Sequence, residues 1–250
     1  MYRGGEPDKP VFIYQYHPTR SGQVPLSFLK GYRGYIQTDA YNGYDALGRQ
    51  AGVDLVGCWA HARRNFVKVV NAKSNKSKTG LADVAIEYIG KLYQIEKQAK
   101  ENNLTPEEMY QLRQEKAKPT LEEFHHWLLA KVDLTPPKGL LGKAINYTLK
   151  YWNRLIRYTE DGRLRPDNNL AENAIRPFVI GRKNWLFNGS PSGAEASSNL
   201  YSLVETAKAA GLKPYKYFRY LLEKLPYAEA EADYTNLLIF PNRPIKYILI

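Results

Sequence analysis

The sequence predicts a mixed α/β chain with a large all-helical segment and further helices toward the C-terminus. Between residues 11 and 72, short runs of β-branched and aromatic residues alternate with helical patterns, the arrangement expected of an α/β layer. After Gly80 the apolar residues instead recur every three or four positions as far as residue 159, as they do on one face of a helix. Helical spacing returns after residue 190, so we expect the strands to be confined to the first part of the chain.

The first part of the chain is expected to alternate strands with helices. The strands are apolar runs bounded by turn-forming residues, over residues 11–16, 34–39 and 54–60. One helix is expected over 24–32, with its end at Gly31 or Gly34, and another over 61–72. The polar stretch 73–80 is expected to be a connection.

The helical segment begins with an expected helix over 81–101. Thr105, Pro106 and Glu108 mark the start of the next helix, because they supply a cap, a proline in the first turn and a capping box. Pro119 is expected to kink that helix, since proline lacks the backbone N–H. A helix over 140–159 follows, and its apolar stripe consists of Leu141, Ile145, Leu149, Trp152 and Ile156.

Two more helices are expected toward the C-terminus. The first covers 191–211 and ends at Gly211, and its apolar stripe consists of Leu200, Leu203, Val204 and Ala207. The second covers 213–225. The remaining tail contains two prolines in its last part and matches no period, so it is expected to be irregular.

Composition narrows the functional classes. The chain has 36 Lys and Arg against 25 Asp and Glu, a net charge of +11, which favours a polyanionic partner but is equally compatible with a basic protein that has none. The single cysteine, Cys58, excludes an internal disulfide. The N-terminal residues have no apolar core, and no apolar run approaches the roughly 20 residues of a membrane span. We therefore expect a soluble, intracellular protein without a membrane partner.

Two carboxylates are candidates for metal-dependent chemistry. Asp39 ends an apolar run, and Glu172 lies in the first turns of a helix that follows the polar residues Asp167, Asn168 and Asn169. Carboxylates bind hard divalent ions, and basic residues bind phosphate; the basic residues after Glu172 are Arg176, Arg182 and Lys183. Local alternatives remain open. Asp39 could be a turn former, Glu172 could favour its own helix N-terminus, and Arg176 could form an i,i+4 ion pair with it.

A second basic group lies at the expected start of the 61–72 helix. His61, Arg63 and Arg64 could contact a DNA backbone near an active site, or could simply be a solvated first turn. Cys58 and His61 have a spacing found in zinc sites, but such a site needs a second pair of ligands. Trp59 and Trp185 are expected in the core rather than as platforms for base stacking.

Three long segments make the sequence recognisable. GYIQTDAYNGYDAL, GCWAHARRNF and the stretch that begins RPDNNLAENAIRPFVIGRKNW resemble the transposases of bacterial insertion sequence family 66, over residues 6–233. The resemblance implies a DDE-type enzyme with a ribonuclease-H-like core, interrupted by the all-α segment. It implies that Asp39 is the second acid of the catalytic triad and Glu172 the third. It also implies Mg²⁺ or Mn²⁺ as cofactor, in a two-ion site.

The resemblance also indicates what this chain lacks. The first catalytic aspartate of the family lies on a strand upstream of the segment that matches residues 1–20. We therefore expect that this chain by itself does not cut or join DNA and that its two-ion site is incomplete. That strand lies centrally in the ribonuclease-H-like sheet, between the first strand of this chain and GYIQTD. We therefore expect an unstable product unless another strand fills the gap.

The expected organisation follows from these assignments. The division is a first part of the core over 1–72, a helical insertion over 81–159, a second part of the core over 160–211, and a C-terminal helix with an irregular tail over 212–250. The expected function is DNA transposition in a bacterial cytoplasm, at the nucleoid when DNA is bound. The expected DNA is the element ends and the target. The alternative is a non-catalytic remnant that binds DNA or associates with itself or with full-length transposase.

Overall fold

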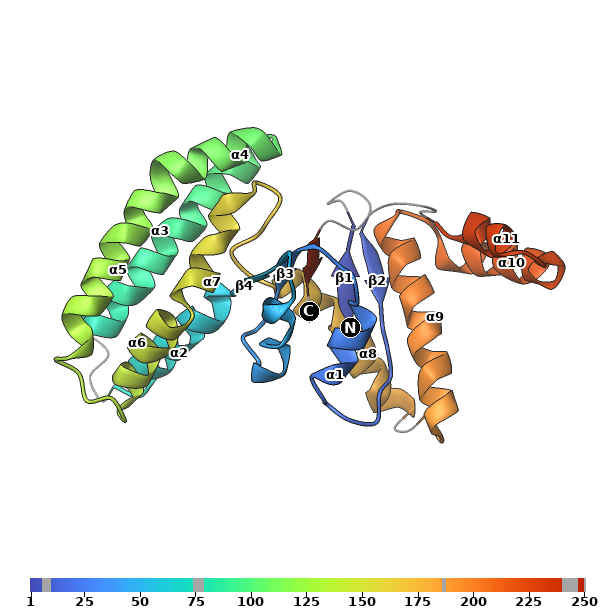
Figure 1. The fold of residues 1–250 in the computed structure, drawn as a ribbon, viewed down its shortest axis with the longest axis horizontal. Coiled ribbons are helices and arrows are strands. Elements are labelled where there is room, and N and C mark those ends of the chain that lie inside the picture. Colours follow the sequence, from blue (N-terminus) through green and yellow to red (C-terminus); the bar gives the residue numbers. More distant parts are fainter. Residues whose placement is uncertain (6–9, 74–78, 186–187, 240–246, 250) are drawn as a thin grey trace. The chain divides into compact units, whose positions relative to one another are not determined.

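The computed structural model describes the backbone of residues 1–5, 10–73, 79–185, 188–239 and 247–249. The side chains of residues 182–185 and 247–249 lie outside the description. Residues 74–78, which belong to the expected connection, lie outside it as well. The chain divides into two compact units. Unit 1 comprises Met1–Ile36, Asn42–Asp54 and Asn169–Ile250, and unit 2 comprises Gln37–Tyr41 and Leu55–Asn168. Within the described residues the chain is a mixed α/β protein that is mostly helical (Figure 1).

Unit 1 is built around a small sheet with the strand order β2-β1-β5-β3-β4. The strands are β1 (Tyr2–Gly4), β2 (Val11–Ile13), β3 (Gly34–Gln37), β4 (Val53–Val56) and β5 (Tyr247–Leu249), and the chain passes into unit 2 within β3 and β4. β1 and β2 form an antiparallel pair in which Arg3 faces Phe12. The expected strands at 11–16, 34–39 and 54–60 are confirmed with shorter bounds, whereas the three-residue β1 is too short to give a sequence pattern.

β5 occupies the position between β1 and β3 in the sheet. It is antiparallel to β1, with Arg3 opposite Leu249 and Gly4 opposite Ile248. The expectation of an irregular tail is therefore wrong for the last residues, since a strand of three residues shows no period by itself. The structure therefore places a C-terminal strand between β1 and β3, and a missing central strand of a ribonuclease-H-like sheet stays a prediction.

Helix α9 (Pro191–Ala209) covers the outer edge of β2. The backbone N–H of Phe12 donates to Thr206 Oγ1 at 3.0 Å, and that of Tyr14 donates to Ser202 Oγ at 2.8 Å. Two hydroxyls one turn apart thus satisfy the backbone groups that an edge strand would otherwise expose. The expected stripe of α9 is only partly correct, because Leu200 is 52% exposed and the buried positions include Ala194, Ser198 and Thr206.

The remaining helices of unit 1 flank this arrangement. They are α1 (Gln23–Phe28), α8 (Asn169–Trp185), α10 (Pro214–Lys224) and α11 (Glu231–Leu237). Tyr14 donates its hydroxyl to the Ala174 carbonyl of α8. Gly211 follows α9 with φ of 73°, a conformation that glycine adopts without strain, so the expected helix end is confirmed. The short α11 was not expected.

Unit 2 is a bundle of helices, with α3 and α5 side by side in Figure 1. Its helices are α2 (Trp59–Asn71), α3 (Leu81–Glu101), α4 (Pro106–Leu112), α5 (Lys118–Val132), α6 (Leu140–Lys150) and α7 (Trp152–Ile156). Residues 81–159 are all described and hold helices and turns without a strand. α2 packs against α3 and α6, which joins it to the segment that the sequence placed apart as an insertion.

An aromatic cluster forms the core of unit 2. Trp59 is fully buried, and its ring lies 6.0 Å from Phe124 and 5.8 Å from Trp152 between centroids. Its indole N–H donates to the Leu155 carbonyl at 2.9 Å. The expected burial of Trp59 is confirmed, while the side chain of Trp185 lies outside the described residues.

Two helices of unit 2 are interrupted where the sequence predicted a kink or a continuous helix. A π-helical turn, Arg113–Ala117, separates α4 from α5, directly before the first turn of α5 that contains Pro119; a proline cannot donate to the preceding turn, which favours a wider turn there. The helix predicted over 140–159 breaks at Tyr151, and a 3-10 turn, Arg157–Glu160, follows α7. None of the helices in the described part of the chain is long and apolar enough to cross a membrane.

Candidate active site and nucleic-acid interface

Asp39 lies two residues beyond β3, at the point where the chain leaves the sheet. The pairing of β3 with β4 extends to Thr38, whose N–H donates to Val56 O at 3.0 Å. Asp39 is exposed, and its Oδ1 accepts a hydrogen bond from the Tyr41 N–H at 3.0 Å. Ala40 between them has φ of 64°, which a tight turn requires. The turn-forming role that the sequence left open is therefore observed, and it leaves the second carboxylate oxygen for other contacts.

Two tyrosines of unit 2 lie close to this turn. Tyr151 Oη is 3.5 Å from the Ala40 carbonyl. Burial raises the pKa of Tyr147 above its ordinary value, and the nearby groups Cys58, Tyr151 and Asp39 raise it further. The Tyr147 phenol therefore stays protonated near neutral pH.

The segment after β4 carries Cys58 and the basic start of α2. Cys58 is 1% exposed, and burial raises the pKa of its thiol to about 11. A protonated thiol is a poor zinc ligand. His61 is half-buried, whereas Arg63 and Arg64 are exposed on α2. The position of the two arginines suits contact with a polyanion.

The residues that precede α8 are fixed within unit 2. Tyr93 of α3 donates its hydroxyl to Asp167 Oδ2 at 2.8 Å. Burial is the main cause that raises the pKa of Tyr93, and Asp167 adds to it, so Tyr93 remains the donor in this pair. The backbone N–H of Trp59 donates to Pro166 O at 2.8 Å. Asn168 is 2% exposed, and α8 begins at the next residue, Asn169.

The third predicted acid lies in the first turn of α8. Glu172 is half-buried there, and Arg176 one turn later is exposed. Arg182 and Lys183 are also in α8, but their side chains lie outside the described residues. Glu172 belongs to unit 1 and Asp39 to unit 2, so the convergence of the two carboxylates stays a prediction.

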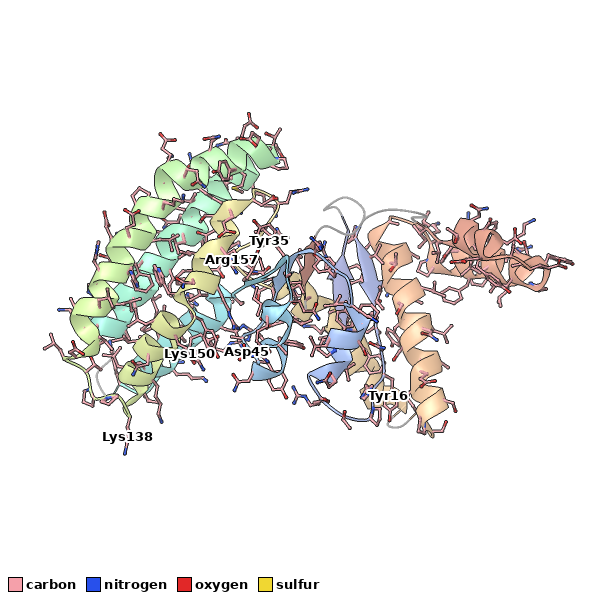
Figure 2. The ribbon with its side chains drawn as sticks, in the orientation of Figure 1. Tyr16, Tyr35, Asp45, Lys138, Lys150 and Arg157 are labelled. Atoms are coloured by element: carbon pink, nitrogen blue, oxygen red, sulfur yellow. The ribbon has the colours of Figure 1, made fainter. Side chains whose placement is uncertain are left out.

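Sequence reasoning missed three side chains that fix the surroundings of Asp39 and Asp167. They are Gln37, Tyr93 and Arg113. Arg113 is 1% exposed and uses all five guanidinium N–H groups: two bind the Glu96 carboxylate at 2.8 Å, and three donate at 2.8 Å to the carbonyls of Tyr158, Asp161 and Leu164. Arg157, labelled in Figure 2, likewise donates to the Leu55 carbonyl at 3.2 Å. A polar residue that binds distant carbonyls leaves no local sequence signal, which is why these roles were missed.

Comparison with known proteins decides the family. Residues 1–196 match the family described as Transposase IS66 family, and residues 202–238 match the IS66 C-terminal element. The chain belongs to the IS66 transposase family. The two matches include both predicted acids, the helices of unit 2 and most of α9, α10 and α11.

Similar proteins of Sinorhizobium fredii are longer than this chain. The uncharacterized protein y4hP is 31% identical over 217 residues, which are 82% of this chain and 39% of that protein. The uncharacterized protein y4jD is 32% identical over 225 residues, which are 88% of this chain and 43% of that protein. The chain thus spans about two-fifths of the length of these curated relatives. No solved structure matches it.

Proposed function

We propose that this IS66-family chain supplies part of the catalytic core of a DDE-type transposase, with Asp39 and Glu172 as its second and third acids. The observation that carries the proposal is the family match across residues 1–196, together with the exposed carboxylate of Asp39 directly beyond β3. The same proposal includes a ribonuclease-H-like arrangement of the sheet, with Asp39 directly after β3.

The donor chemistry at Asp39 fits Mg²⁺ or Mn²⁺. The carboxylate is a hard oxygen ligand, and the Tyr41 N–H occupies only Oδ1, at 3.0 Å. Asp39 and Glu172 would hold the ions in this proposal. Bound divalent ions would lower the pKa of an attacking water and stabilise charge at the phosphorus.

The side chains around Asp39 limit its alternatives. Burial raises the pKa of the Tyr147 phenol, so this neighbour of Asp39 brings no charge that would compete with a cation for the carboxylate. Arg63 and Arg64 are exposed on α2 and would neutralise phosphates of a bound DNA backbone. The basic residues of α8 would also neutralise phosphates, and they are Arg176, Arg182 and Lys183.

Binding to DNA should depend strongly on salt and little on sequence, because backbone contacts release counterions. Replacing Arg63 and Arg64 together by alanine should flatten the plot of log affinity against log salt by roughly one per lost contact. The matched control is Lys97 and Lys100 to alanine, two exposed lysines of α3. Equal slopes of log affinity against log salt in both double variants would contradict a specific role for the arginines. The double variant of Arg182 and Lys183 to alanine is compared with the same control.

Catalysis is tested by cleavage of DNA that carries the ends of the insertion element, with Mg²⁺ or Mn²⁺ present. Two proteins should be compared, this chain and one extended upstream toward the length of its relatives. The proposal predicts metal-dependent cleavage by the extended protein that Asp39→Asn and Glu172→Gln abolish. Cleavage that survives both substitutions contradicts the assigned acids.

A second candidate function, self-association or association with a longer transposase, is favoured by α10 and the turn after it. One face of α10 is buried, with Tyr217 and Leu221 at 7% and 6% exposure. Three large apolar side chains remain 80%, 69% and 81% exposed: Tyr215, Leu222 and Tyr227. Sedimentation should show a dimer that Leu222→Glu weakens, and a monomer at all concentrations would exclude self-association.

A further inference from the structure

Gln37, the last residue of β3, joins two segments of unit 2 through its side-chain amide. It is 2% exposed. Its Nε2 donates to Gly57 O at 3.0 Å and to Arg165 O at 2.7 Å. Gly57 directly follows β4, and Arg165 precedes α8 by four residues. One amide group therefore ties the end of β3 to the end of β4 and to the segment that leads into α8.

The chemistry of the two contacts fixes the orientation of the amide. Both partners are carbonyl oxygens, which only accept hydrogen bonds, so the nitrogen and not Oε1 must face them. Glutamine supplies two N–H groups on one atom, one for each carbonyl. Methionine, of similar shape, supplies none, and a glutamate carboxylate would place an oxygen against both carbonyls.

The segment that Gln37 holds has further anchors in the same unit. Pro166 O accepts from the Trp59 N–H at 2.8 Å, and Asp167 accepts from Tyr93 at 2.8 Å. Arg113 holds the carbonyl of Leu164 at 2.8 Å. Residues 164–167 thus each form a hydrogen bond with a different element of unit 2. Gln37 is the partner that lies nearest in sequence to Asp39.

We propose that Gln37 is a positioning residue that holds the 165–168 segment against the strand end that carries Asp39. Its functional meaning rests on the proposed function, because Glu172 follows that segment on α8. Gln37 does not need to touch metal or DNA in this role. It restricts the motion of residues 165–168, which lie between Asp39 and Glu172 in the sequence.

The amide of Trp59 reports on this role, because its N–H donates to Pro166 O in the held segment. Hydrogen exchange measured by NMR should show at least about tenfold faster exchange at the Trp59 amide in Gln37→Met, since the variant loses both hydrogen bonds of the Gln37 amide and leaves two buried carbonyls without these donors. The Leu155 amide, which donates to Tyr151 O at 2.9 Å in the same unit, should exchange as in the wild type. The matched control is Gln111→Met, on the exposed face of α4.

Gln37→Glu supplies a test that does not depend on the methionine variant folding. A buried carboxyl has a raised pKa, and its protonated form can donate one of the two hydrogen bonds. Exchange at Trp59, relative to wild type at the same pH, should therefore be fast at pH 8 and recover in part toward pH 5. A residue that merely fills space would show no such recovery. Gln111→Glu should stay at the wild-type rate throughout.

Two outcomes would overturn the proposal: wild-type exchange at Trp59 in folded Gln37→Met, or a Trp59 rate in Gln37→Glu that follows the wild type at every pH. The proposed function is judged separately by Mn²⁺ binding to the same proteins. If Trp59 responds as expected but wild-type chain binds no Mn²⁺ through Asp39, the positioning role stands and the metal-site assignment fails.

Discussion

Units 1 and 2 differ in the groups that form hydrogen bonds with their backbone N–H and carbonyl groups. Unit 2 uses long polar side chains that reach several carbonyls at once, with Arg113 binding those of Tyr158, Asp161 and Leu164. Unit 1 uses short hydroxyls and an added strand, with Ser202 and Thr206 on the edge of β2 and β5 between β1 and β3. Several side chains and one backbone N–H therefore form hydrogen bonds with the segment before α8. The edge of the unit 1 sheet relies instead on two hydroxyl groups of α9.

The largest expected effect concerns Arg113. Replacing it by methionine leaves Glu96 without its bidentate partner and three carbonyls without donors, so the free energy of unfolding of unit 2 should fall by about 3–5 kcal/mol. Tryptophan fluorescence during urea unfolding measures this, because Trp59, Trp127 and Trp152 belong to unit 2. The matched control is Lys97→Met, which removes an exposed i,i+4 pair with Glu101 in the same unit and should cost about 0.5 kcal/mol or less. Similar losses in both variants would contradict the contrast between the buried and the exposed ion pair.

A smaller effect is expected where β5 enters the sheet of unit 1. Proline at Ile248, which faces Gly4 of β1, should remove strand pairing and lower the free energy of unfolding by roughly 2 kcal/mol. Hydrogen exchange at β1 amides measures the change. A chain that ends at Ile239 should show the same loss together with concentration-dependent aggregation, since β1 and β3 then expose their edges. Unchanged exchange in both proteins would show that β5 does not stabilise the sheet.

These two contrasts show what the sequence could and could not predict. Periodicity predicted the bounds of α3. Residue types predicted the capping box at Thr105 and Glu108 and the stop at Gly211 just after α9, because local forces determine these features. It did not predict β5, since pairing with β1 is a contact between the two ends of the chain. The positions of Asp39 beyond a strand and Glu172 in a first turn were predicted. The ties made by Gln37, Tyr93 and Arg113 were not, because each depends on which distant carbonyl or carboxylate the fold brings near.

The smallest expected effect on stability concerns the helix that covers β2. Thr206→Val keeps the shape of the side chain but removes the oxygen that accepts from the Phe12 N–H, so unit 1 should lose about 1–2 kcal/mol. Thr235→Val is the control, since that hydroxyl bonds at 2.8 Å to the Glu231 carbonyl within its own helix and its loss should be near zero. Faster hydrogen exchange at Phe12 and Tyr14 in the first variant alone would confirm the edge contact. Equal behaviour of the two variants would argue against it.

The most direct test of the proposed active site is Mn²⁺ binding, followed by electron paramagnetic resonance of the free ion. Asp39→Asn and Glu172→Gln keep the shapes of the two side chains and remove their charges. Asp133→Asn and Glu195→Gln make the same changes at two exposed positions, the residue directly after α5 and a residue of α9. If Asp39 and Glu172 share a divalent-metal site, each of the first two substitutions should raise the dissociation constant at least about tenfold, and the two controls should bind as the wild type does. Binding that is equal in all five proteins would contradict the assignment of these carboxylates as metal ligands.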